Sequence, residues 1–230
     1  MKNTIKYIAF DADDTLWVNE PYFRQTELKF FEILKAYLPA EEINNQLYKT
    51  EMKNLADYGY GIKSFVLSLV ETAISVSSGT INISVISEIL KLGKEMINMP
   101  LELLDGVEEV LKTLSNRYKL VVATKGDLLD QERKLNKSNL ASYFHHIEVM
   151  SDKQEFNYQN LIKHLDIKPN ELLMIGNSMK SDILPVLAIG GYAAHVPFHT
   201  TWIHEVVENS DFEHNFFYKL QSIKDILKHV

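Results

Sequence analysis

Two aspartates near the N-terminus, Asp11 and Asp13, are the residues whose types and spacing best support chemistry. They follow a short apolar run over residues 5–10, which predicts a buried strand that presents polar groups at its C-terminal end. One carboxylate there can attack phosphorus to form an acyl phosphate, while a second acid can protonate the departing alkoxide and later deprotonate water. The pattern therefore predicts Asp11 as a nucleophile and Asp13 as a general acid and base.

Polar residues at the ends of two later predicted strands supply groups that can bind a phosphate. Thr124 carries a hydroxyl, and the backbone amides of Lys125 and Gly126 follow it in a strand-to-loop turn, where backbone donors are exposed. Lys153 follows the next predicted strand, and its ammonium can neutralise charge on the nucleophile and on a phosphoryl group. The side chain of Lys125 is a further candidate for a phosphate contact beside Thr124.

An oxygen-rich loop over residues 176–182 contains Asn177 and Asp182 and follows another predicted strand. Ligands of open α/β sheets bind outside the carboxyl ends of the strands, so we expect Asp11 and Asp182 to hold one cation there. Magnesium takes oxygen ligands, of which only one or two are protein carboxylates. The chain contains no cysteine, which excludes disulfides, thiolate metal sites and cysteine nucleophiles. The predicted cofactor is therefore Mg²⁺.

The spacing of apolar residues divides the chain into an α/β core and a helical insert. Helical spacing with few strand-like runs predicts helices at 22–38, 41–58, 63–74 and 84–97. After Pro100, strands at 119–123, 146–150, 172–175 and 191–196 alternate with helices at 106–114, 128–135, 156–165, 180–188 and 222–228. This alternation predicts a doubly wound parallel sheet. We expect a core domain of residues 1–17 and 100–230 and a cap domain of residues 18–99.

Charge and hydropathy narrow the classes of partner. The 24 basic and 31 acidic residues give a formal net charge of -7, so the chain has no general attraction for a nucleic-acid backbone. No segment approaches the length of a membrane span, and Asp11 interrupts the first apolar run before it reaches the length of a signal-peptide core. We expect a cytoplasmic protein that acts on a small molecule, without nucleic-acid or membrane partners.

The ordered set of these residues resembles a known family. Asp11-x-Asp13-x-Thr15, Thr124, Lys153 and Gly176–Asp182 are similar to the four motifs of the haloacid dehalogenase-like (HAD) hydrolase superfamily. The resemblance spans nearly the whole chain, and the helical insert is similar to the C1-type cap of that family. It implies a modified Rossmann core and a magnesium-dependent phosphatase that forms an aspartyl-phosphate.

The resemblance also implies a role for each motif residue. Asp11 corresponds to the nucleophile and a magnesium ligand, and Asp13 to the acid and base that also binds magnesium through its backbone carbonyl. Thr124 and Lys153 correspond to the groups that stabilise phosphate and charge, and Asp182 to a magnesium ligand. Many members carry Asp where this chain has Asn177, so we expect weaker magnesium binding than an acidic residue would give.

Several alternatives remain open from the sequence. Trp17 either packs the entrance to the cap or lines the substrate pocket. The glycines of Gly59-Tyr60-Gly61, with Lys63 after them, allow a tight turn that we interpret as a specificity loop. His195 and His199 lack the spacing of a metal site and have no assigned role.

Other functions are compatible with the same motifs. A non-catalytic phosphate- or partner-binding relative is the main alternative, supported only by Asn177. A 2-haloacid dehalogenase also begins with aspartate attack, but its halide leaves without protonation, so Asp13 argues against it. A phosphomutase would differ only in where the phosphoryl group is transferred next.

Overall fold

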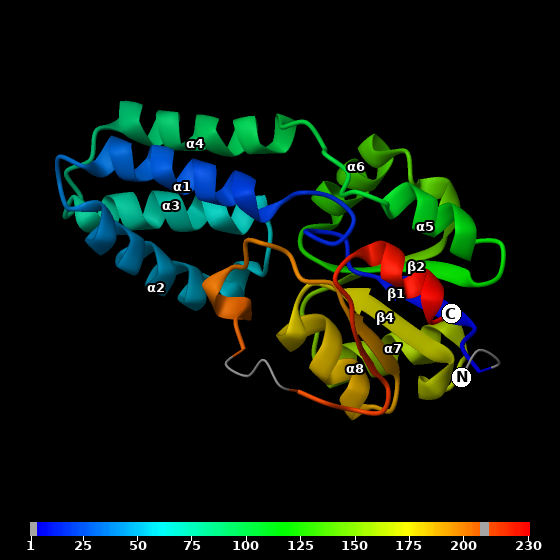
Figure 1. The fold of residues 1–230 in the computed structure, drawn as a ribbon. Helices are drawn as coiled ribbons and strands as arrows, with labels where there is room; N and C mark the ends of the chain where they lie inside the picture. The colour runs from blue at the N-terminus through cyan, green and yellow to red at the C-terminus, as the bar shows by residue number, and fades with distance from the viewer. Residues whose placement is uncertain (1–3, 208–211) are drawn as a thin grey trace. The chain divides into compact units, whose positions relative to one another are not determined.

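The computed structural model describes residues 4–207 and 212–230 and divides into two compact units (Figure 1). Unit 1 comprises Met1–Glu20, Leu101–Lys125 and Gln131–Val230, and unit 2 comprises Pro21–Pro100 and Gly126–Asp130. The domain limits predicted from the sequence, after residues 17 and 99, lie within a few residues of the observed ones. The segment Gly126–Asp130, which we placed in the core domain, groups with unit 2.

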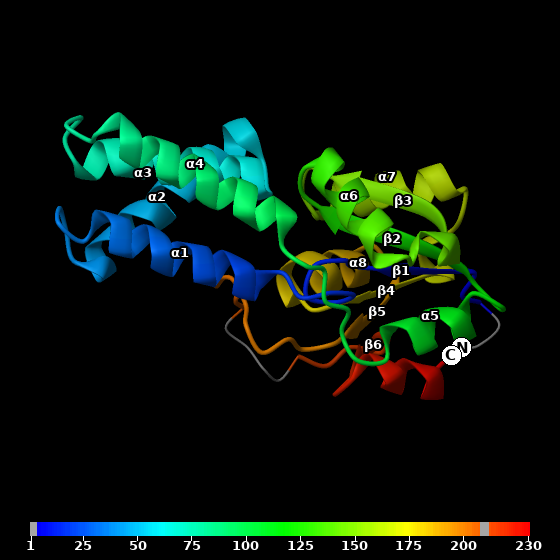
Figure 2. The ribbon, with the colours of Figure 1, turned by 90° about the horizontal axis from the view of Figure 1, so that it is seen from above.

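Unit 1 is built on one six-stranded parallel sheet. Its strands are β1 (Tyr7–Phe10), β2 (Lys119–Lys125), β3 (Phe144–Met150), β4 (Leu172–Gly176), β5 (Tyr192–His195) and β6 (Phe217–Lys219). Figure 2 shows their order across the sheet, β3-β2-β1-β4-β5-β6, and every neighbouring pair is parallel. The predicted doubly wound parallel sheet is confirmed. The prediction missed β6, because three residues are too few to show an alternating pattern.

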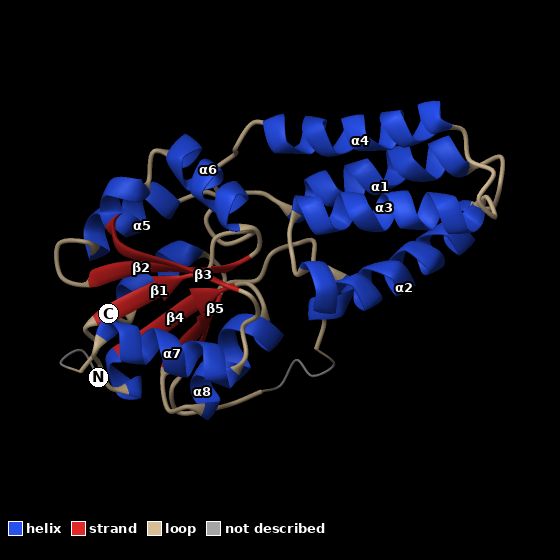
Figure 3. Ribbon diagram, turned by 180° about the vertical axis from the view of Figure 1, so that it is seen from behind, coloured by secondary structure: helices blue, strands red, loops and turns tan. Residues whose placement is uncertain are grey.

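Helices cover both faces of this sheet (Figure 3). On one face lie α5 (Val107–Leu114), α6 (Leu128–Ser138) and the 3₁₀ helix η5 (Ile223–Lys228), and on the other lie α7 (Glu155–Leu165) and α8 (Leu184–Ala188). The side chains of β1 alternate between the two cores, Ile8 and Phe10 in the first and Tyr7 and Ala9 in the second. Burial on both faces explains why β1 reads as a continuous apolar run.

Two predicted helices of unit 1 differ in type from the prediction. The segment expected as one helix at 180–188 is a π-helical turn, η3 (Met179–Ile183), followed by α8. Ser178 caps η3 by accepting a hydrogen bond from the Ser181 amide at 3.0 Å, which holds this loop in its own conformation. Pro185 lies in the first turn of α8, where its missing amide proton costs little. The predicted C-terminal helix is the 3₁₀ helix η5.

Unit 2 consists mainly of four helices around a core of its own (Figure 1). They are α1 (Glu20–Leu34), α2 (Ala40–Tyr58), α3 (Ile62–Val76) and α4 (Ile83–Asn98), at the places predicted from the sequence. Apolar side chains of all four helices, such as Phe30, Leu47, Leu69 and Ile89, are buried together. The apolar residues of each helix recur at helical spacing because only one face of that helix packs against the other helices.

The turn at Gly59–Gly61 joins α2 to α3, and both glycines have positive φ angles of 68° and 109°. Lys63, in the first turn of α3, forms an ion pair with Asp127 at 2.9 Å. The interpretation of this turn as a specificity loop stays a prediction.

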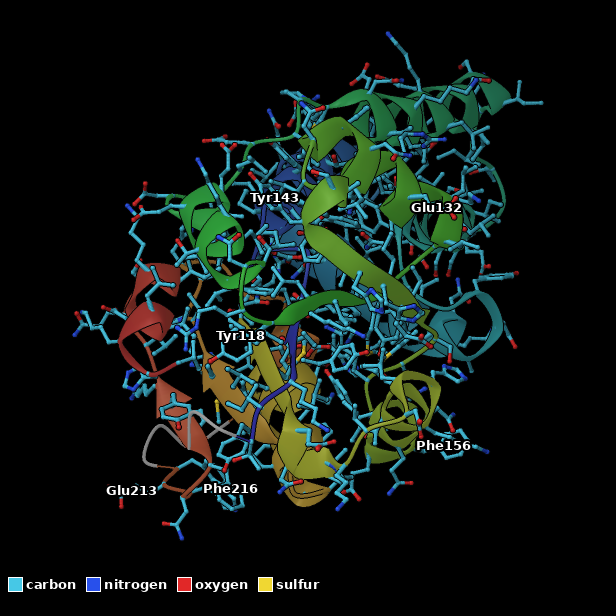
Figure 4. The ribbon with its side chains drawn as sticks, turned by 90° about the vertical axis from the view of Figure 1, so that its right-hand side faces the viewer. Tyr118, Glu132, Tyr143, Phe156, Glu213 and Phe216 are labelled. Atoms are coloured by element: carbon cyan, nitrogen blue, oxygen red, sulfur yellow. The ribbon has the colours of Figure 1, made fainter. Side chains whose placement is uncertain are left out.

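The described surface includes polar and apolar side chains. Glu132 on α6 is exposed, and so is Phe156 at the start of α7, with 68% of its surface accessible (Figure 4). Within residues 4–207 and 212–230, the helices are too short or too polar to cross a membrane.

Candidate active site

The register of the central strands places Asp11 between the ends of two neighbouring strands. Phe10, the last residue of β1, is level with Val122 on β2 and Ile175 on β4. β1 ends at Phe10, and the Asp11 amide still donates to the Ile175 carbonyl on β4 at 2.9 Å. The carboxylate of Asp11 therefore lies at the carboxyl edge of the sheet, where open α/β folds bind ligands.

Lys153 joins Asp11 and Asp182 in a buried cluster. Its Nζ donates to Asp11 Oδ1 at 2.5 Å and to Asp182 Oδ1 at 2.7 Å. The exposed fractions of the three residues are 7% for Asp11 and 1% each for Lys153 and Asp182. The two carboxylates, 171 positions apart in the sequence, thus meet at one ammonium group, within the reach of a single cation.

Burial and charge have opposite effects on these ionisable groups. Burial raises the pKa of Asp11 to about 7; the Lys153 ammonium opposes this rise and the Asp182 charge adds to it. Burial alone would lower the pKa of Lys153, but the charges and hydrogen bonds of Asp11 and Asp182 outweigh it and raise that pKa. Lys153 is therefore charged at neutral pH.

Thr15 and Asn177 lie beside the same cluster. The Thr15 hydroxyl is 3.3 Å from Asp11 Oδ2 and 3.2 Å from Asn177 Oδ1, so it can donate to either oxygen. The Ser178 amide donates to Asp182 Oδ2 at 2.9 Å and fixes that carboxylate from the backbone. The described residues thus gather two carboxylates and one amide oxygen around the end of β1.

This donor set fits magnesium. Residues 4–207 and 212–230 contain no group of three or more His, Cys, Asp or Glu side chains arranged to hold a metal ion. Magnesium does not need such a group, because one or two carboxylates suffice when substrate oxygens and waters complete its octahedron. Asp11 and Asp182 would supply the carboxylates, and Asn177 Oδ1 lies next to Asp11 across the Thr15 hydroxyl.

Three donors hold the side chain of Asp13. Trp17 Nε1 donates to Oδ1 at 2.7 Å, Gln131 Nε2 donates to Oδ2 at 2.9 Å, and Lys134 Nζ lies 2.9 and 3.0 Å from the two oxygens. Trp17 is buried and donates directly to the predicted acid and base, while its place in the substrate pocket stays a prediction. Both oxygens of Asp13 are engaged, so its orientation is fixed.

Gln131 and Lys134 were not among the residues selected from the sequence. They lie three positions apart on α6, a spacing that places two side chains on one face of a helix. That spacing was visible in the sequence, but nothing in it indicated that this face of α6 meets the loop after β1.

The predicted phosphate-binding residues have different surroundings. Thr124 is buried near the end of β2, and its hydroxyl lies 3.2 Å from the Lys125 carbonyl. The Lys125 ammonium forms an ion pair with Glu205 at 2.6 Å, a partner that the sequence did not suggest. Gly126 begins the segment that groups with unit 2. The contacts of Thr124, Lys125 and Gly126 with phosphate stay predictions.

Comparison with known proteins identifies the family. A family model described as haloacid dehalogenase-like hydrolase matches residues 5–190, which is most of the chain. The chain belongs to the haloacid dehalogenase-like hydrolases. This membership covers all four motifs named from the sequence, from Asp11 to Asp182. A search of curated proteins found no match.

Among solved structures, this HAD hydrolase is similar to a haloacid dehalogenase-like family hydrolase from Xanthomonas campestris. The two are 34% identical, with a TM-score of 0.86, over 96% of this chain and 88% of the other. The putative HAD hydrolase YfnB from Bacillus subtilis, solved bound to magnesium, is 15% identical with a TM-score of 0.67, over 99% of each chain. A predicted phosphoglycolate phosphatase from Haemophilus somnus is 16% identical with a TM-score of 0.64, over 99% and 98% of the two chains.

Structures of comparable similarity include a 2-haloacid dehalogenase from Pseudomonas syringae. These distant likenesses show the HAD fold alone. Phosphatases and dehalogenases share it, so the choice between the two reactions depends on the residues of the site.

Proposed function

We propose that this HAD hydrolase is a magnesium-dependent phosphatase that cleaves a small phosphorylated metabolite through an aspartyl-phosphate intermediate. The observation that carries the proposal is the buried cluster in which Lys153 bridges Asp11 and Asp182, with Asp13 held nearby. Membership of the family supports a hydrolase, and the four motif residues support attack by Asp11.

The proposed reaction has two displacements at phosphorus. A carboxylate oxygen of Asp11 attacks phosphorus, the ester P–O bond breaks, and the departing alkoxide takes a proton from Asp13. Asp13 then removes a proton from water, which attacks the phosphorus of the acyl phosphate and releases inorganic phosphate and the carboxylate of Asp11. Lys153 stays charged and stabilises the negative charge that develops on the phosphoryl oxygens.

Magnesium bound between Asp11 and Asp182 would add positive charge next to the phosphoryl oxygens and align them with the nucleophile. The ionised form of Asp11 is the nucleophile; burial raises the pKa of Asp11 to about 7, and the charge of Lys153 opposes that rise. Trp17, Gln131 and Lys134 donate to both oxygens of Asp13 in this structure, so one of these contacts must be released before Asp13 can carry a proton to the leaving alkoxide.

Asp13 also favours a phosphatase over a dehalogenase. A halide leaves as a stable anion, whereas an alkoxide needs a proton, so an acid next to the nucleophile serves ester cleavage. Dehalogenation of a 2-haloacid is the second candidate, because related structures include such enzymes.

Hydrolysis of p-nitrophenyl phosphate with and without Mg²⁺ tests the proposal. We expect Mg²⁺-dependent release of phosphate, and we expect Asp11→Asn to lower kcat by at least about 10³-fold because the nucleophile is lost. Asp166→Asn is the matched control, since Asp166 is an exposed aspartate of unit 1. Circular dichroism checks that both variants are folded.

The alternatives give different results in the same experiment. A panel of phosphorylated metabolites would identify the ester, and chloride release from 2-chloropropionate would indicate a dehalogenase instead. If the folded protein with Mg²⁺ hydrolyses none of these compounds and Asp11→Asn changes nothing, the enzyme proposal fails and a non-catalytic binding protein takes its place.

A further inference from the structure

Glu205 is a largely buried carboxylate that the proposed reaction does not use. It ends the short 3₁₀ helix η4 (Ile203–Glu205), which follows β5 in the chain, and its side chain is only 12% exposed. Lys125 Nζ donates to its Oε1 at 2.6 Å. The hydroxyls of Ser178 and Ser181 donate to its Oε2 at 2.5 and 2.6 Å. Three donors from two other strand ends therefore converge on this carboxylate.

The charge of Glu205 is stable in this environment. Burial alone would raise the pKa of Glu205, but the Lys125 charge and the hydrogen bonds from Lys125, Ser178 and Ser181 outweigh it and lower that pKa to about 2. Glu205 is therefore ionised at neutral pH. Hydrogen bonds to a charged group stabilise by more than those between neutral groups, so this contact is a strong local constraint.

A short chain of hydrogen bonds connects Glu205 to Asp182. The Ser178 amide donates to Asp182 Oδ2 at 2.9 Å, and the Asp182 amide donates to the Ser178 carbonyl at 2.8 Å. Ser178 thus bonds Asp182 through both of its backbone groups: its amide bonds the side chain of Asp182, and its carbonyl accepts from the amide of Asp182. Glu205 in turn accepts the hydroxyl proton of Ser178, so it fixes the residue that fixes Asp182.

Lys125 extends this constraint across the sheet. Its ammonium donates to the Ser181 hydroxyl at 2.9 Å as well as to Glu205. Lys125 ends β2 and Ser181 lies in the turn after β4, and these two strands flank β1, the strand that carries Asp11. The Glu205 carboxylate therefore joins the strand ends on both sides of the nucleophile.

We propose that Glu205 is a positioning residue for the divalent-cation site: through Ser178 it holds the carboxylate of Asp182 where a cation shared with Asp11 requires it. This inference rests on the proposed function, because it assumes that Asp182 binds magnesium. Glu205 touches neither Asp11 nor Asp182 in any contact described above, so its effect passes through Ser178. It also forms an ion pair with Lys125, while Lys153 contacts Asp11.

Magnesium binding measured by calorimetry without substrate is the direct test. For Glu205→Ala we expect a Kd for Mg²⁺ about 10-fold higher than that of the wild type, because the Ser178 hydroxyl loses its acceptor and the loop relaxes. Glu205→Gln keeps the size and one acceptor oxygen, so we expect a smaller rise. With p-nitrophenyl phosphate, kcat at saturating Mg²⁺ should fall less than 3-fold, while the Mg²⁺ concentration for half-activity rises with the Kd.

Glu171 provides a matched control. Its side chain is 14% exposed, it pairs with Lys6 at 2.7 Å and it accepts the Lys168 amide at 2.8 Å. It directly precedes β4, at the end of that strand opposite to the Asp182 loop. Glu171→Ala removes a comparable ion pair from the same unit, and we expect it to leave the Kd for Mg²⁺ unchanged.

The outcomes separate the two proposals. If the wild type binds Mg²⁺ and the folded Glu205→Ala variant binds it equally well, the positioning role is wrong while the proposed function stands. If the folded wild type binds no Mg²⁺, both are wrong. If both Glu205 variants unfold, Ser178→Ala decides by the same titration, because it removes the hydroxyl link and keeps the backbone amide that bonds Asp182. An unchanged Kd in that variant would also overturn the positioning role.

Discussion

Burial and local partners together set the charge of each carboxylate in and near the candidate site. Burial is the largest influence on Asp11 and Asp14, and it raises the pKa of each to about 7. Glu205 is also largely buried, but the Lys125 charge and three hydrogen bonds bring its pKa down to about 2. The difference follows from the partners: Glu205 accepts hydrogen bonds from Lys125, Ser178 and Ser181, whereas Asp11 shares the Lys153 ammonium with a second carboxylate, Asp182.

Asp14 gives a prediction at this scale. It has a positive φ of 61° and accepts the amides of Asn19 and Glu20 at 2.8 to 3.1 Å, at the start of α1. Because its pKa is raised in the folded state, the folded protein binds more protons than the unfolded chain between about pH 4 and pH 7. The contribution of Asp14 to stability therefore falls as pH rises through this range.

Asp14→Asn removes this titration and retains an acceptor oxygen and tolerance of the left-handed backbone conformation. We expect the free energy of unfolding of the variant, relative to the wild type, to increase by at least about 1 kcal/mol between pH 5 and pH 8. Urea titrations at the two pH values measure this difference. The exposed Asp166, with a φ of 52°, provides the control Asp166→Asn. A difference independent of pH would contradict the prediction.

Among the elements, the loop after β4 has the closest packing around the proposed cation site. Gly176 ends β4, and a Cβ atom built on it would overlap the carboxyl group of Asp182. The same loop accepts constraints from Lys153, which bonds the Asp182 side chain, and from Ser178, which caps η3. Gly176 is needed here for close approach, since its φ angle is not in the positive region.

Gly176→Ala should displace the Asp182 carboxylate. We expect a loss of about 1–3 kcal/mol in the free energy of unfolding from the forced contact. We also expect Mg²⁺ binding at least about 10-fold weaker, a factor equivalent to about 1.4 kcal/mol. Urea unfolding and calorimetry measure the two effects.

Ile175→Val is the control, because it removes one buried methyl group from the same strand and should cost about 0.5–1.5 kcal/mol without changing Mg²⁺ affinity. Unchanged binding in a folded Gly176→Ala variant would contradict this account.

At the scale of the whole molecule, each unit has its own hydrophobic core. The two clusters that flank the sheet contain residues of unit 1, and the cluster among α1 to α4 contains residues of unit 2. The residues Asp11, Asp182 and Glu205 of the proposed site belong to unit 1. A substitution that weakens the core of one unit should therefore lower the stability of that unit more than the stability of the other.

Leu69→Ala tests this independence. Leu69 is fully buried in α3, so we expect the helical unit to lose about 2–5 kcal/mol of stability. Both tryptophans, Trp17 and Trp202, belong to unit 1, so their fluorescence reports the unfolding of that unit, whereas far-ultraviolet ellipticity reports both units. The ellipticity transition in urea should shift to lower concentration more than the fluorescence transition.

Leu161→Ala in α7 is the reverse control, because Leu161 is fully buried in unit 1. It should shift the fluorescence transition. Equal shifts of both signals in Leu69→Ala would mean that the units unfold as one.

Local pattern determined much of this fold and several residues of its candidate site. Strands buried on both faces read as continuous apolar runs, and helices with one buried face read as periodic stripes, so five of the strands and the four helices of unit 2 could be placed. Asp11, Lys153 and Asp182 could be selected because polar residues at the carboxyl ends of parallel strands must gather at one edge of the sheet. β6, with three residues, was too short to leave such a pattern.

Only the tertiary structure decided the partners of these residues. Gln131 and Lys134 reach Asp13 across 118 and 121 positions of sequence, and Glu205 reaches Lys125 across 80. No local pattern marks such pairs, because the residues next to a lysine in the sequence do not reveal whether its side chain is solvated or pairs with a distant residue. Their proximity depends on which face of α6 packs on the sheet and on where the chain returns after β5, and both are set by the packing of the complete core.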